Sequence, residues 1–106
     1  MTDMPASIKV GPHVYSVVRQ TKAQMPNLMG DSDFDLMQIR VRQRLKKSKS
    51  KEILIHELLH VCSYPSFTGV YAENEKYTPE EMINAIAPVL LQVVQDNPEL
   101  LEYLTQ

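Results

Sequence analysis

Residues 56–60 read His-Glu-Leu-Leu-His and contain two of the three histidines of the chain. On a helix, side chains four residues apart lie on one face, so the imidazoles of His56 and His60 can reach a single metal ion. Glu57 follows directly, so its carboxylate lies beside such an ion and can take a proton from a water molecule. Zinc acidifies water and polarises carbonyl groups, as peptide hydrolysis requires. The pattern predicts a zinc site with Glu57 as general base; the alternative is a surface helix with two incidental histidines.

A catalytic zinc site needs a third protein ligand and one open position for water. The remaining histidine, His13, lies in the N-terminal region, and no histidine follows His60. A carboxylate from the next predicted helix is therefore expected. We favour Glu80, which lies nearer the apolar face of that helix than Glu81 does. Acidic residues are also favoured in a first helical turn by the helix dipole alone, so other carboxylates stay open as ligands: Glu81, Glu75 and Glu73.

Two tyrosines and one strand are candidates for contacts with a substrate. Tyr71 and Tyr77 lie near the proposed ligands in sequence and can donate a hydrogen bond to an oxyanion, although buried tyrosines more often serve packing. The strand expected at residues 38–42 precedes the metal-binding helix. If this strand lies at a sheet edge, its backbone can pair with an extended peptide.

The strands that must support this site are expected in the first half of the chain. Residues 8–10 and 13–18 read as two strands around a Gly-Pro turn. Residues 22–35 contain proline, glycine and several Asp and Asn residues, so they read as a loop with room for a short helix or strand. Residues 37–42 alternate apolar and polar side chains, which is typical of a half-buried strand.

The first predicted helix carries residues 56–60. Either Ser48 or Ser50 can cap its start, and we expect it to run to about Ser63, where the nearby Pro65 stops it. Its apolar residues repeat on the side that would face a core.

The second predicted helix begins with a strong capping signal. Thr78 is suited to the N-cap, a proline follows it, and Glu81 completes a capping box. Pro88 removes a backbone hydrogen bond within this helix, so a kink is expected there. A short terminal helix is expected at residues 99–104.

Composition bounds the class of protein. The 106 residues suit one domain, which we assign to residues 1–106, with 43% hydrophobic and 23% charged residues. No apolar run is long enough for a membrane span, and no secretory signal is recognised, so a cytoplasmic protein is expected. Cys62 is the single cysteine, so it cannot form an internal disulfide or a Cys-based zinc site, and it reads as a small core residue.

Charge is concentrated in one segment. The net charge is −2, yet seven of the eleven basic residues lie between Arg40 and Lys51 with no acid among them. Such a block can bind nucleic acid or an acidic partner, or it can be a solvated strand edge and loop. It contains no aromatic residues, which counts against stacking on single-stranded nucleic acid.

At residues 56–60 the sequence resembles the zincin metallopeptidases. It looks most like small members in which His-Glu-x-x-His is followed by a Glu from a second helix. The layout is similar to ImmA/IrrE-type domains and, more closely, to short phage- and prophage-encoded proteins. The likeness extends to the strand at 8–15, the acidic helix start at 78–81 and the segment 96–100. It implies an α+β fold, with a small antiparallel sheet packed on the metal-binding helix beside a second, kinked helix.

The resemblance also implies zinc ligation by His56, His60 and a helix-borne Glu, with Glu57 as general base and a protein or peptide as substrate. A phage-encoded member would act in the host cytoplasm. The sequence departs from the pattern around the third ligand, where residues 80–85 match only in part. It also lacks the longer insertions that shape the cleft of larger peptidases.

Three functional hypotheses follow from these residues. The first is a zinc metallopeptidase. The second is a metal-binding interaction protein with little or no turnover. The third is a nucleic-acid-associated protein that uses the block from Arg40 to Lys51. Retention of Glu57 favours the first over the second, because a structural zinc site fills all four positions with protein ligands and needs no base.

Overall fold

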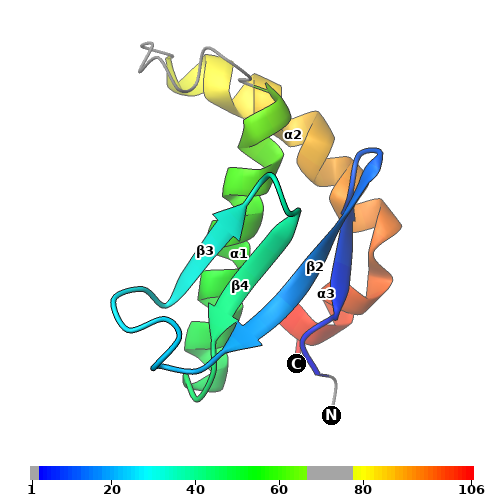
Figure 1. The fold of residues 1–106 in the computed structure, drawn as a ribbon. Coiled ribbons are helices and arrows are strands. Elements are labelled where there is room, and N and C mark those ends of the chain that lie inside the picture. Colours follow the sequence, from blue (N-terminus) through cyan, green and yellow to red (C-terminus); the bar gives the residue numbers. More distant parts are fainter. Residues whose placement is uncertain (1–2, 67–77) are drawn as a thin grey trace.

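The computed structural model describes residues 3–66 and 78–106, and for residues 64–66 it describes the backbone alone. One four-stranded sheet lies against helix α1 (Figure 1). Helix α2 packs on α1 and on the edge strand β1, and α3 follows it. The bounds of the elements are β1 Ser7–Val10, β2 His13–Gln20, β3 Gly30–Asp33, β4 Gln38–Arg42, α1 Lys47–Ser66, α2 Pro79–Asp96 and α3 Pro98–Leu104.

The fold is α+β, as expected, but the sheet is mixed rather than wholly antiparallel. Its strand order is β1-β2-β4-β3. The pairs β1–β2 and β3–β4 are antiparallel, whereas β2 and β4 run parallel. The cause is β3, which lies within the segment 22–35, predicted from sequence as a loop with room for a short helix or strand. Because the chain reverses at β3 and again at β4, β4 enters the sheet beside β2 in the same direction.

The core lies between the sheet and the helices: mainly α1, with Val93 of α2 and Leu100 and Tyr103 of α3. In β4, Ile39 and Val41 are buried while the alternate residues Gln38, Arg40 and Arg42 are partly exposed, so the period-two pattern is confirmed. Helix α1 buries Leu54 and Leu58 on the same side of the sheet. Cys62 belongs to this core, and its burial raises the pKa of the thiol to about 11.

Both ends of α1 differ slightly from the prediction. The helix begins at Lys47, just before the two candidate cap serines, and continues to Ser66. Pro65 therefore lies in the last turn rather than beyond the helix. A proline cannot donate a backbone hydrogen bond and its ring crowds the carbonyl four residues earlier, and the helix ends one residue after Pro65.

The start of α2 is the predicted capping box. The Glu81 N–H donates to Thr78 Oγ1 at 3.1 Å, and the Thr78 N–H donates to the Glu81 carboxylate at 3.0 Å. The hydrogen bond from the Thr78 N–H to the carboxylate, and then one from the Thr78 side chain, lower the pKa of Glu81. Pro88 lies inside α2, which continues through it to Asp96. No helix in the described ranges is both long and apolar enough to cross a membrane.

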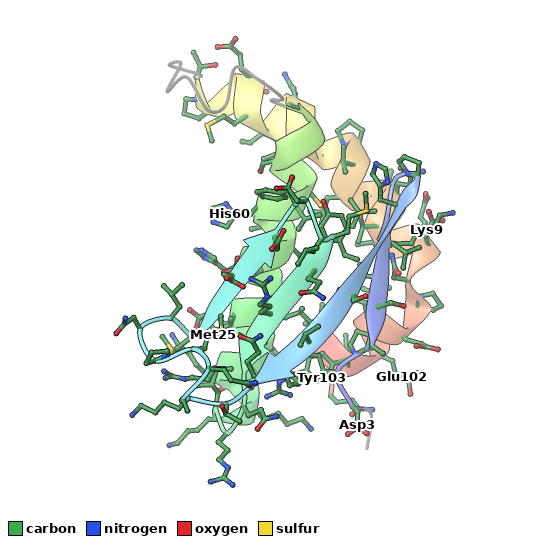
Figure 2. All side chains as sticks on the ribbon, in the orientation of Figure 1. Asp3, Lys9, Met25, His60, Glu102 and Tyr103 are labelled. Carbon is green, nitrogen blue, oxygen red and sulfur yellow. The ribbon has the colours of Figure 1, made fainter. Side chains whose placement is uncertain are left out.

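Asn97, between α2 and α3, ties the helices to the edge strand β1. Its Oδ1 accepts the Lys9 N–H at 2.9 Å, and its Nδ2 donates to the Lys9 carbonyl at 2.8 Å. Nδ2 also contacts the Val93 carbonyl at 2.8 Å. One amide therefore substitutes for a neighbouring strand at this position of β1. Figure 2 shows Lys9 on the side of the molecule that faces α2.

We expect Asn97→Ala to lower the free energy of unfolding by about 1–3 kcal/mol, because it leaves Lys9 N–H and C=O without this partner. Urea unfolding followed by circular dichroism measures the change. Asn84→Ala, at an exposed position of α2, is the matched control and should cost little. Equal losses in the two variants would show that the Asn97 amide has no special role.

Candidate metal centre

Helix α1 presents His56 and His60 on its exposed side, away from the buried Leu54 and Leu58. Their Nε2 atoms lie 3.3 Å apart, and the rings meet edge to face at 68° with centroids 4.9 Å apart. Two nitrogens at zinc-binding distance in a tetrahedral arrangement would be separated by about 3.3–3.4 Å. The donor atoms are therefore spaced as two ligands of one ion would be.

The same separation also suits a hydrogen bond between two neutral rings, one donating through Nε2 and the other accepting. Which ring carries the proton depends on the tautomers, and both arrangements fit the ring positions. The donor set thus fits zinc without requiring it, and binding of the metal itself is the property to test.

Glu57 is buried, although a carboxylate is costly to remove from water without a partner. Its partner is Ser32 on β3, whose hydroxyl lies 2.9 Å from Oε1 and 3.2 Å from the Glu57 carbonyl oxygen. The second carboxylate oxygen, Oε2, lies 4.0 Å from Nε2 of His56. Ser32 therefore holds one oxygen of Glu57 while the other faces the histidine pair.

Gly30 lets β3 come close enough to α1 for this contact. A Cβ atom at this position would lie 2.5 Å from Cγ2 of Ile53, 3.1 Å from the Arg40 carbonyl oxygen and 3.3 Å from Cγ of Glu57. The first distance is far below a van der Waals contact, so any side chain here would push the strand away from the helix. Gly30 and Ser32 share the face of β3 that lies on α1, because alternate residues of a strand share a face.

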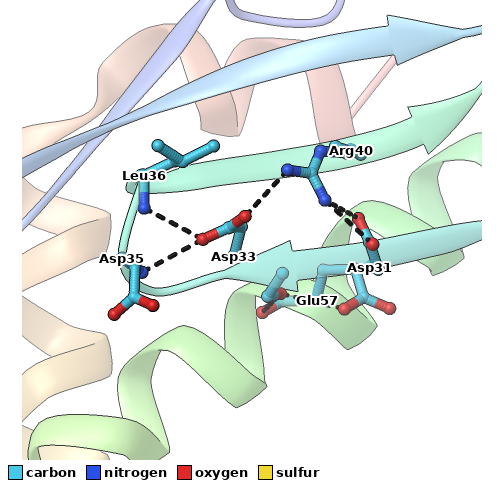
Figure 3. Close-up of polar contacts among 7 residues, drawn as sticks. Asp31, Asp33, Asp35, Leu36, Arg40 and Glu57 are labelled. Atoms are coloured by element: carbon cyan, nitrogen blue, oxygen red, sulfur yellow. Dashed lines mark hydrogen bonds and ion pairs between the residues drawn. The ribbon is translucent and has the colours of Figure 1, made fainter.

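The opposite face of β3 carries two carboxylates that bind one arginine of β4. Arg40 donates to both oxygens of Asp31, at 3.3 and 3.1 Å, and to Asp33 at 2.9 Å (Figure 3). Asp33 also accepts from the backbone N–H groups of Asp35 and Leu36 in the turn. The hydrogen bond from Leu36, then the one from Arg40, lower the pKa of Asp33, and Asp33 in turn raises the pKa of Arg40. These ionic contacts hold β3 in place beside β4.

The exposed edge next to the histidines belongs to β3, so residues 38–42 do not meet the condition under which their backbone could pair with a peptide. Strand β4 pairs on both sides, with β2 and with β3. The Arg42 N–H donates to the Met29 carbonyl at 2.8 Å, which sets the register. Asp31 then exchanges hydrogen bonds with Arg40, and the backbone groups of Gly30 and Ser32 point to the outer side of the sheet.

The third ligand is not assembled in the part of the chain that the structure describes. Residues 3–66 and 78–106 contain no group of three or more His, Cys, Asp or Glu side chains that could hold a metal ion. Glu80 is exposed in the first turn of α2 and is not grouped with the two histidines. Glu81 is occupied in the capping box, and His13 is exposed at the start of β2. The other candidates lie outside the described residues: Tyr71, Tyr77, Glu73 and Glu75.

The sequence predicted His56, Glu57 and His60 as site residues, and these lie close together on α1, but it did not indicate Gly30 or Ser32. The segment Gly-Asp-Ser-Asp contains no apolar or β-branched residue, so it lacks the usual signal of a strand. Its only strand-like signal is alternation, with small residues at 30 and 32 and carboxylates at 31 and 33. Comparisons of the chain with protein-family models, curated proteins and solved structures found no match.

We expect Gly30→Ala to lower the free energy of unfolding by about 1–3 kcal/mol, because the new methyl group overlaps Ile53 Cγ2. Urea unfolding measures the loss. Ile53→Ala removes the overlapping atom, so the double variant should lose less than the sum of the two single variants. Strict additivity would contradict the proposed contact.

Proposed function

We propose that this protein binds one zinc ion through His56 and His60 and hydrolyses peptide bonds, with Glu57 as general base. The observation that carries the proposal is the pair of Nε2 atoms 3.3 Å apart beside a buried carboxylate 4.0 Å from one of them. When bound, zinc would supply Lewis-acid polarisation of the scissile carbonyl and would acidify the attacking water.

The residues of the chain supply the proton transfer. Ser32 fixes one oxygen of Glu57, so the other is held in a defined direction toward the exposed side of α1. A general base in this position accepts the proton of the attacking water and can pass it to the leaving amine. Because Glu57 is held by β3 as well as by its own helix, little reorganisation is needed at the moment of transfer.

The outer edge of β3 supports a peptide as the substrate class. The outward backbone groups of Gly30 and Ser32 offer donors and acceptors to an extended chain. Ser32 also contacts Glu57 through its side chain. A peptide paired with β3 would therefore lie beside the general base, whereas the other sheet edge, β1, is occupied at Lys9 by the Asn97 amide.

We expect about one zinc per chain in protein supplied with the metal and then dialysed, measured by elemental analysis. His56→Ala should lose it, since one remaining histidine cannot hold zinc tightly. His13→Ala, which removes an exposed histidine on β2, should retain it. Glu80→Ala should weaken binding if Glu80 is the third ligand, and retention in that variant would move the ligand to another carboxylate. Absence of zinc from the wild type would refute the proposed site.

We expect Glu57→Gln to keep the zinc but to lower peptide cleavage by about a hundredfold or more, the size typical of a lost general base. A mixture of synthetic peptides of varied sequence is incubated with the zinc-loaded protein, and mass spectrometry then detects cleavage of any of them. Glu52→Gln, at an exposed position of α1, is the matched control. Zinc binding without cleavage of any peptide would favour the metal-binding interaction protein instead.

A further inference from the structure

The basic segment between Arg40 and Lys51 divides into paired and unpaired cations in the structure. Arg40 is bound to Asp31 and Asp33, as described above. Lys49 lies 3.3 Å from Glu52. Lys51 donates to the Gln106 carbonyl and lies 5.9 Å from the ring centroid of Tyr103. These three side chains are therefore held by contacts within the protein.

The unpaired cations gather around one hollow. Its volume is about 560 Å³, and no acidic residue lines it; the lining residues are Thr21, Lys22, Ala23, Arg42, Gln43, Arg44 and Leu45. Lys46 and Lys47 continue the positive surface at the start of α1. We call Lys22, Arg44, Lys46 and Lys47 the basic end of the molecule. All four are exposed, and none forms an ion pair with another described residue.

Lys22 belongs to the basic end although it is remote in sequence from the basic segment. Residues 21–23 follow β2, and residues 42–45 follow β4. Because β2 and β4 are parallel neighbours, both strands end at the same side of the sheet. The fold therefore collects cations from two connections at one place.

The start of α1 carries cations next to a helix end that is itself positive. A helix N-terminus carries partial positive charge and favours acidic side chains in its first turn. The first turn of α1 contains none and begins with Lys47. Cations are thus concentrated where the backbone is already positive, an arrangement that a bound anion would stabilise.

We propose that the basic end binds the phosphate backbone of double-stranded nucleic acid. No aromatic side chain lines the hollow, and Leu45, its largest apolar residue, is partly buried. Protein interfaces depend on aromatic and apolar anchors, and single-stranded nucleic acids stack on aromatic rings. Cations without such anchors match phosphates, which position a duplex without reading its sequence. The proposal uses none of the residues of the candidate metal centre.

The test is binding of a fluorescently labelled DNA duplex of about 24 base pairs to the wild-type protein, followed by anisotropy from about 50 to 200 mM salt. We expect the logarithm of the affinity to fall linearly with the logarithm of the salt concentration, with a slope of about −3 to −4 for up to four phosphate contacts. No binding at the lowest salt concentration would overturn the proposal.

A matched pair of variants distinguishes binding at the basic end from an effect of net charge alone. Lys22→Gln should weaken binding several-fold and make the salt slope less steep by about one. Lys9→Gln makes the same change in net charge at the other end of the sheet, where Lys9 of β1 pairs with Val14 near the start of β2, and should leave binding unchanged. Equal effects of the two substitutions would overturn the proposal. Circular dichroism checks that both variants stay folded, as expected for exposed side chains.

Two competitors distinguish the partner classes. Unlabelled duplex should displace the probe, whereas a single strand of the same length should do so only weakly. Displacement by polyglutamate at an equal concentration of charge would point to an acidic protein partner and would contradict the assignment to a duplex.

Discussion

The contact between β3 and α1 at Gly30 is the constraint on which the candidate site depends. With no side chain at this position, the strand lies against Ile53 and the stem of Glu57. Only at this separation can the Ser32 hydroxyl reach the Glu57 carboxylate at 2.9 Å. A buried acid on the helix therefore has its partner on a strand that the chain forms some 25 residues earlier.

The two faces of β3 contact different parts of the protein. Toward α1, the strand offers Gly30 and Ser32, which permit close packing and hold Glu57. On the other face, Asp31 and Asp33 bind Arg40 and keep the strand beside β4. A four-residue strand without apolar residues gains little from burial, so these polar contacts must supply much of what keeps it in the sheet. The resulting edge is short, and the backbone groups of Gly30 and Ser32 remain on its outer side.

Sequence predicted the parts of this structure that follow from local rules. The alternation around Ile39 and Val41 identified a buried strand, and Thr78 with Glu81 identified the start of α2. The position of β3 could not be predicted, because its place depends on contacts with Arg40 and α1 rather than on its own residues. The parallel pairing of β2 and β4 was missed for the same reason. Spacing alone suggested the histidine pair, but the anchor of Glu57 required the three-dimensional arrangement.

The Asn97 amide links Lys9 to a residue 88 positions later in the chain. Closing so long a loop is slow in comparison with hairpin or helix formation, because its entropy is lost before the contact forms. During synthesis, β1 and β2 emerge well before Asn97, so the outer edge of β1 stays uncovered until Asn97 has been synthesised. Completion of the fold is thus tied to the arrival of the α2–α3 junction, and a ribosome-bound chain that stops before it would expose a strand edge to its neighbours.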